Sequence, residues 1–289
     1  MAAAKVPSLL GSVTWVVGGV GIVGRGIAGA LLRAGSIVIV NSRFPGRLEA
    51  LNEDLGYPEN LVSVHGTMLP GGAAETLEKA MQRTGNRLDH VVAHSAVRWW
   101  ANHAGDESST LAAQGGGSSG LRLLSFEPSE FISHATQLAS LHYTAAHSLL
   151  PRMTGSPNRP SYTFVTGGGG ALHTAWGPRS AIGQVNAHAV WGLSAALRCE
   201  VSESNWPVRV SELRVGLRLN RPASERAIDP RETPLSNDIG EIVAGIAAAA
   251  PTTHEANELY TVSDSDEVQK MKQRFPVATI GYSVYFRPE

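Results

Sequence analysis

A glycine cluster near the start of the chain has the residue types and spacing that suit phosphate binding. Gly19, Gly21 and Gly24 directly follow the apolar run 13–17, and small and apolar residues continue as a helix from about residue 22. Glycines allow a tight turn and a close backbone approach to a pyrophosphate, and the free N–H groups of a helix N-terminus attract the anion. In this strand–turn–helix context the Gly-x-Gly-x-x-Gly spacing predicts a dinucleotide site. A tight turn that binds no ligand is the alternative.

The elements that must position this turn alternate regularly along the chain. Apolar runs predict strands at 13–17, 36–40, 61–64, 88–93, 161–166, 207–213 and 258–262. Helices are expected at about 22–33, 73–83, 128–153, 180–204 and 238–250, with one more around Leu48, Leu51 and Leu55. Strands that alternate with helices form a parallel sheet with helices on both faces. We therefore expect a single doubly wound Rossmann-type α/β domain of about seven parallel strands over residues 1–289.

Two segments fall outside this alternation. Residues 99–125 include Trp99, Trp100 and a Gly/Ser-rich run, which is the composition of a long loop. Such a loop is either a functional lid or a neutral insertion. The tail 265–289 contains the apolar stretch 277–286, which we expect to pack against the rest of the chain.

The composition excludes several kinds of partner. The chain has 289 residues, of which 43% are hydrophobic, and a formal net charge of −1, so neither nucleic acid nor a membrane surface is favoured as a partner. Cys199 is the only cysteine, which rules out an intrachain disulfide and a cysteine-rich metal site. No apolar stretch has transmembrane length, and residues 1–5 lack the apolar core of a signal peptide. We expect a cytoplasmic protein with no metal.

Residues 10–265 resemble the short-chain dehydrogenase/reductase superfamily. The glycine loop 18–24 looks like the nucleotide loop of that family's extended branch, and Gly192-Leu193-Ser194 is similar to its Gly-Leu-Ser/Thr motif. Residues 208–216 and 237–243 are similar to its sixth strand and late helix. The resemblance implies NADP(H) as the cofactor. The cofactor-binding residues that it implies are Gly18, Gly21, Ile22, Val23, Gly24, Ser42, Arg43, His65, Gly66, Ser95 and Ala96.

Arg43 indicates which dinucleotide is preferred. It lies shortly after the second predicted strand and looks like the arginine that the family uses on the adenosine 2′-phosphate. A guanidinium there replaces the acid that would hold a free ribose 2′-hydroxyl, which favours NADP(H) over NAD(H). Arg47, one helical turn later, could assist. A solvated loop charge is the alternative for Arg43.

The catalytic residues of the family are missing from the matching positions. In the family a tyrosine is the general acid, a lysine one helical turn later lowers its pKa, and a serine polarises the carbonyl. Aligned on the Gly-Leu-Ser motif, the tyrosine position falls on Gly183, the lysine position on Ala187 and the serine position near Gly167. The asparagine of the preceding helix falls near Leu138. No lysine occurs between positions 79 and 270 and no tyrosine between 162 and 260, so no shift of the alignment restores the pair.

Two further motifs depart from the family pattern. His65-Gly66 stands where the family has Asp-Val beside the adenine, and a neutral histidine can still accept a hydrogen bond from an amino group. After the fourth predicted strand, Ala93-His94-Ser95-Ala96 replaces Asn-Asn-Ala-Gly.

Three residues are candidates for replacement chemistry. His94 at the tip of the fourth strand and His173 after the fifth lie near the expected mouth of the site, and a histidine can act as a general acid near neutral pH. Thr166 could supply a hydroxyl. A hydrogen-bonded structural role is the alternative for each. Gln184 and His188 lie about 100° around the helix from the lost pair, which argues against substitution. Packing or interface roles are expected for His134, His142, Tyr143 and His147 on the long helix.

Three functions remain open for the chain. It could be an NADP(H)-binding protein without ordinary carbonyl reductase activity, which is the reading that we favour because the tyrosine–lysine pair is missing. It could be a divergent NADPH-dependent oxidoreductase that acts on a small carbonyl substrate with other acid groups. It could also be a non-redox isomerase or cyclase, against which the glycine loop and Arg43 argue. The family's association through two long helices implies a homodimer or homotetramer, or a hetero-oligomer with an active paralogue, with a small-molecule ligand.

Overall fold

The computed structural model describes residues 6–94, 126–153, 160–167, 181–217, 236–249 and 257–280. Its strands form one seven-stranded sheet in the order β3-β2-β1-β4-β5-β6-β7, and every neighbouring pair is parallel. The predicted Rossmann-type α/β architecture is therefore confirmed. The strands are β1 (Val13–Val17), β2 (Ile37–Ser42), β3 (Leu61–His65), β4 (His90–His94), β5 (Ser161–Gly167), β6 (Arg209–Val215) and β7 (Leu259–Val262).

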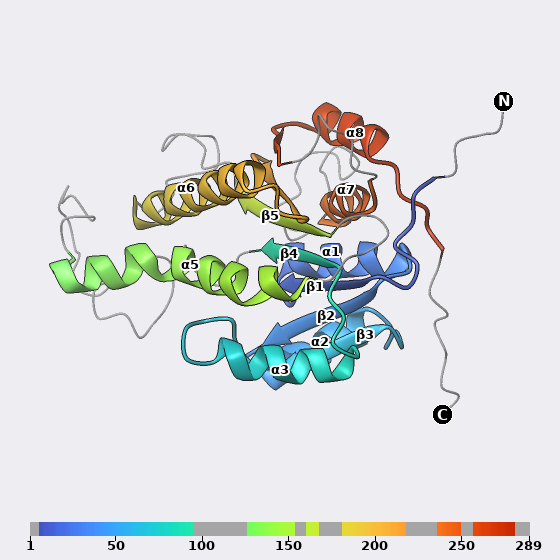
Figure 1. Cartoon of the computed structure of the whole chain (residues 1–289), viewed down its shortest axis with the longest axis horizontal. Coiled ribbons are helices and arrows are strands. Elements are labelled where there is room, and N and C mark those ends of the chain that lie inside the picture. Colours follow the sequence, from blue (N-terminus) through green and yellow to red (C-terminus); the bar gives the residue numbers. More distant parts are fainter. Residues whose placement is uncertain are drawn as a thin grey trace, which may run out of the picture.

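Helices cover both faces of this sheet (Figure 1). Helices α3, α5 and α6 share one buried core with it, and α1, α2, α7 and α8 share the other. Neighbouring strand residues alternate between the two cores, so Trp15 belongs to the first and Val16 to the second. The helices are α1 (Ile22–Arg33), α2 (Pro45–Asp54), α3 (Ala73–Arg83), α5 (Pro128–Leu149), α6 (Ala181–Glu203), α7 (Ser236–Ala248) and α8 (Ser265–Arg274), and the short 3-10 helix η3 (Leu150–Arg152) follows α5. None of the helices in the described ranges is both long and apolar enough to cross a membrane.

Helix α8 was not predicted. It lies at the start of the tail 265–289, for which the apolar stretch suggested only packing. An Asp264 carboxylate oxygen accepts a hydrogen bond from the Glu267 N–H at 2.8 Å and so caps the helix. The helix buries only Val268 and Met271, so its apolar periodicity is weak. Beyond it, the Ile280 N–H donates to the Arg33 carbonyl at 2.8 Å, while residues 281–289 and the predicted loop 99–125 lie outside the described ranges.

Helix α1 is held against α7 by two glycines. A Cβ atom on Gly26 would overlap the backbone of Ser236, and one on Gly240 would overlap the Gly26 carbonyl oxygen. The two helices can approach this closely only because neither position carries a side chain. Their contact fixes the helix that follows the predicted dinucleotide turn.

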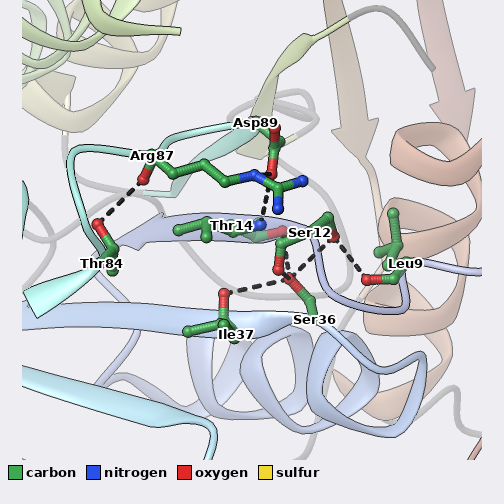
Figure 2. Close-up of polar contacts among 9 residues, drawn as sticks. Leu9, Ser12, Thr14, Ser36, Ile37, Thr84, Arg87 and Asp89 are labelled. Atoms are coloured by element: carbon green, nitrogen blue, oxygen red, sulfur yellow. Dashed lines mark hydrogen bonds and ion pairs between the residues drawn. The ribbon is translucent and has the colours of Figure 1, made fainter. Parts of the chain in front are cut away.

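The amino ends of the central strands are joined by buried polar contacts (Figure 2). One oxygen of Asp89, Oδ2, accepts the Val13 N–H at 2.8 Å and pairs with the Arg87 guanidinium at 2.8 Å. The Thr14 and Ser36 hydroxyls lie 2.8 Å apart, and both side chains are buried. These contacts tie β1 to the segments that begin β2 and β4. They leave the carboxyl ends of the strands as the edge at which open α/β sheets bind ligands.

Two histidines, His90 and His142, are buried against the sheet, and His94 at the end of β4 is partly buried. His90 on β4 lies with its Nδ1 2.9 Å from the Ser161 hydroxyl of β5, and His142 on α5 packs against the Phe164 ring. Burial lowers the pKa of His90 and of His142 to about 3, and that of His94 to about 4. All three are therefore neutral in the folded protein at pH 7.

These histidines should make the protein sensitive to mild acid. Well above pH 6.5 they are neutral in both states and contribute no pH dependence. As the pH falls from about 6.5 toward about 4, the unfolded chain binds protons that the folded protein does not, so the free energy of unfolding decreases. Each histidine contributes at most about 1.4 kcal/mol per pH unit in this window. Urea denaturation between pH 7.5 and 5 measures the slope.

A pair of variants isolates the effect of one imidazole. His142→Leu removes a buried histidine and should make the slope shallower, whereas His147→Leu removes an exposed one on the same helix and should leave it unchanged. Equal slopes for the wild type and His142→Leu would contradict the burial argument.

Candidate functional site

The turn between β1 and α1 is built from glycines, of which Gly18 and Gly24 disfavour any larger residue. Gly18 has a φ of +83°, a conformation that side chains disfavour. A Cβ atom on Gly24 would overlap the Gly18 carbonyl oxygen and lie 2.7 Å from the Gly19 Cα. The first turn of α1 is thus packed directly onto the loop that precedes it. The sequence-predicted residues Gly18 to Gly24 form one compact strand–turn–helix unit.

Within the described part of the chain, no side chain caps the N-terminus of α1, which faces this turn. Gly21 is the N-cap residue, no side chain caps the helix, and its first turn contains no acidic residue. Among the described residues, a Cβ atom on Gly21 would meet the Gly18 carbonyl oxygen alone, at 3.8 Å. Ile22 and Val23 supply the first backbone N–H groups of the helix, which are left unpaired by helix geometry. Open space and a positive dipole end together fit an anionic group such as a pyrophosphate.

Two arginines flank an aromatic ring at the end of β2. The Arg43 and Arg47 guanidinium carbons lie 5.6 and 5.1 Å from the centroid of the exposed Phe44 ring. The Ser42 hydroxyl accepts the Phe44 N–H at 3.1 Å, which orders the turn. Because β2 is the neighbour of β1, these cations lie beside the glycine turn at the same edge. Two exposed guanidiniums and a hydroxyl are suitable partners for a phosphate.

The end of β3 contacts the end of β2 near the two arginines. A His65 ring nitrogen, Nε2, lies 3.2 Å from the Arg43 carbonyl oxygen, so that nitrogen must donate if it is bonded there. Gly66 follows, and its carbonyl oxygen accepts the Asn41 amide at 3.3 Å. The Asn41 Oδ1 also accepts the Trp15 indole N–H at 3.0 Å. Sequence reasoning missed Asn41, although an asparagine inside an apolar strand is a recognisable signal of a buried polar contact.

The structure describes two of the three candidates for replacement chemistry, His94 and Thr166, and their surroundings differ. His94 ends β4, and burial holds its pKa near 4, so it is not the protonated acid that was expected near neutral pH. The Thr166 hydroxyl lies near the end of β5 but donates to Glu212 at 2.7 Å. His173, Ser95 and Ala96 lie outside the described residues.

Glu212 and Arg214 form an ion pair that sequence reasoning did not find. Glu212 is completely buried on β6, and its Oε1 accepts the Arg214 Nε and Nη2 at 2.9 and 2.8 Å. The Arg214 guanidinium lies over the Trp191 ring of α6, 4.1 Å from its centroid. The two charged residues alternate with apolar ones in β6, and this alternation places them on the face covered by α6. That pattern is the signal that could have revealed the pair.

Helix α6 carries two small residues, Gly183 and Ala187, at the positions that the sequence resemblance aligns with a tyrosine and a lysine. Gly183 is buried and Ala187 is 9% exposed. Between them, the Asn186 side-chain amide donates to the His134 carbonyl of α5 at 2.8 Å, and its oxygen accepts the Leu138 N–H at 3.3 Å. Asn186 therefore bonds to a carbonyl and to an N–H that lie four residues apart on α5, and in this way it joins the two long helices.

The other polar residues on the long helices have local partners. The exposed His188 ring bonds back to the Gln184 carbonyl at 2.8 Å, and its centroid lies 4.4 Å from that of the Trp191 ring. On α5, Tyr143 stacks on His147 with centroids 5.9 Å apart. These contacts agree with the packing roles expected for them.

Sequence comparison alone identifies no relative. No family model matches the chain. No curated protein matches it significantly.

Solved structures nevertheless share its architecture. The Pseudomonas aeruginosa RhlG/NADP active-site complex superposes with a TM-score of 0.65 at 18% identity, over 90% of this chain and 98% of that one. The 3-ketoacyl-(acyl-carrier-protein) reductase from Brucella melitensis, complexed with NADH, gives 0.61 at 17% identity over 88% and 98% of the two chains. Glucose dehydrogenase of Caenorhabditis elegans gives 0.60 at 17% identity over 88% and 96%. The chain is thus a seven-stranded Rossmann-type α/β protein with the same fold as these three.

Proposed function

We propose that the chain is a divergent member of the short-chain dehydrogenase/reductase superfamily that binds NADP(H) and lacks ordinary carbonyl reductase activity. The main support for the proposal is a contrast between two parts of the site at the carboxyl edge of the sheet, the β1–α1 turn and helix α6. The β1–α1 turn keeps an uncapped helix N-terminus and open space at Gly21. Helix α6 carries Gly183 and Ala187, neither of which can transfer a proton.

The residues at this edge fit a nicotinamide dinucleotide. The turn at Gly18 to Gly24 would hold the pyrophosphate, Ser42 and Arg43 the adenosine 2′-phosphate, and His65 and Gly66 the adenine. Two of the solved structures with this fold are complexes with NADP or NADH, which supports a cofactor of this class. When bound, the nicotinamide would supply a hydride acceptor or donor.

The groups around the expected substrate are poor proton donors. The Thr166 hydroxyl proton is bonded to Glu212, and His94 is neutral at pH 7. The second candidate, an NADPH-dependent oxidoreductase of a small carbonyl substrate, is supported by the reductase and the dehydrogenase among the proteins that share the fold. It would have to use other acid groups or water.

The proposal extends to a cytoplasmic, single-domain protein that associates through α5 and α6. Ile132 and Tyr143 on α5 are 62% and 57% exposed, which is unusual for large apolar side chains and supports a covered face. A homodimer, a homotetramer or a hetero-oligomer with an active paralogue would use this face.

Loss of the Arg43 guanidinium should discriminate between the two nucleotides. Arg43→Ala is expected to weaken NADPH binding about tenfold to a hundredfold and NADH binding little, because a charge-assisted bond to phosphate contributes about 1.5–3 kcal/mol. Titration calorimetry on the whole chain measures both constants. Arg152→Ala, which removes an exposed arginine of η3, is the control and should change neither. Equal losses for NADPH and NADH would refute the 2′-phosphate contact, and a wild type that binds neither would refute the cofactor.

The wild-type protein should not turn over simple carbonyl substrates. Mixed with NADPH and a panel of small aldehydes and ketones, it is expected to oxidise no NADPH above the rate without protein, because α6 offers no tyrosine or lysine. Absorbance at the nicotinamide band measures the rate. Turnover that His94→Ala abolishes would instead establish the second candidate function.

A further inference from the structure

A polar cluster at the ends of β5 and β6 takes no part in the proposed nucleotide site. It consists of Thr166, Glu212, Arg214 and Trp191, and we refer to it as the Glu212 cluster. One carboxylate oxygen of Glu212 receives three hydrogen bonds, one from Thr166 and two from Arg214. Because the carboxylate is completely buried, these bonds hold it in one place.

This arrangement decides what the Thr166 hydroxyl can offer a ligand. A hydroxyl has one hydrogen, and that of Thr166 is donated to Glu212 at 2.7 Å. Its oxygen can therefore only accept a hydrogen bond from a further group. To polarise a carbonyl, Thr166 would have to break a bond to a buried carboxylate, which costs about 1.5–3 kcal/mol.

The second oxygen of Glu212 is a further acceptor. Oε2 is buried and has no hydrogen-bond partner among the described residues. The Arg214 guanidinium balances the charge of the carboxylate, so a neutral donor suffices and no cation is required. A hydroxyl or an amide N–H could donate to Oε2 or to the Thr166 oxygen, whereas a carbonyl oxygen can donate to neither.

We infer that the Glu212 cluster is a hydrogen-bond-accepting subsite, which selects a ligand with a hydroxyl or amide N–H over the matching carbonyl compound. Thr166 makes the contact, and Glu212 is the positioning residue that fixes its proton. The inference rests on the proposed function for its location, since the cluster lies at the carboxyl edge where the nucleotide would bind. It gives that function a ligand class, and it explains why the hydroxyl nearest the family's serine position does not serve carbonyl reduction.

A matched pair of probes tests this selectivity. The whole protein, with 13C-methyl-labelled threonine and NADP+ present, is titrated with cyclohexanol and with cyclohexanone. The two probes share a six-membered ring, and their oxygen is a hydroxyl that can donate in the first and a carbonyl that can only accept in the second. Cyclohexanol is expected to shift the Thr166 methyl signal and to bind at least about tenfold more tightly, because a site built for a hydrogen bond rejects the analogue without it. In Glu212→Gln the amide can donate to Thr166 and free its proton, so the preference should vanish or reverse.

Two further variants complete the test. Thr166→Val keeps the shape of the side chain, and it should abolish the preference as measured by saturation transfer to the probes, even if Glu212→Gln fails to fold. Glu258→Gln removes a carboxylate that pairs with Arg274 on the surface, and it should behave like the wild type. The inference is overturned if cyclohexanone binds as well as cyclohexanol, if Glu212→Gln folds and keeps the wild-type preference, or if neither probe perturbs Thr166 at its solubility limit. NADP+ titration of the same samples reports separately on the proposed function.

Discussion

The packing of α1 onto its own preceding loop is the constraint on which the rest of the site depends. Gly24 leaves no room for a side chain between the helix and the Gly18 carbonyl, and Gly26 brings the same helix against α7. Helix α1 is thus fixed from two sides with its N-terminus directed into the turn. The free N–H groups at that terminus are a consequence of helix geometry, and the absence of a side-chain cap leaves them for an anion.

The carboxyl edge of the sheet has two halves with different chemistry. Around β1, β2 and β3 the residues suit a phosphorylated nucleotide: backbone N–H groups, two exposed arginines, and a turn stabilised by Asn41. Around β5, β6 and α6 several polar groups bond to one another instead. Thr166 donates to Glu212, and Asn186 joins α5 to α6. Groups already paired in this way hold the structure together and are poorly placed to exchange protons with a substrate.

The sequence pattern was sufficient for the sheet and for the glycine turn between β1 and α1, because those features are local. Apolar runs located the strands, and the glycine turn lies within a dozen residues of β1. The Glu212 cluster was not predictable in the same way, since Thr166 and Glu212 are brought together only by the pairing of β5 with β6. The apolar pattern did not predict helix α8, because its cap and terminal charges stabilise it more than an apolar stripe does. The pKa of His94 depends on burial, which no local pattern reveals.

The central claim is that the open N-terminus of α1 holds a dinucleotide phosphate, and Gly21→Val tests it most directly. Gly21 has a φ of −80° and a ψ of 169°, which any residue adopts, and a Cβ there meets no atom of the residues that the structure describes closer than 3.8 Å. The variant should therefore fold and melt like the wild type while its side chain occupies the space in front of the helix. Calorimetric titration with NADPH should show binding to the wild type and none to the variant. A folded Gly21→Val protein that binds NADPH as tightly as the wild type would contradict the account.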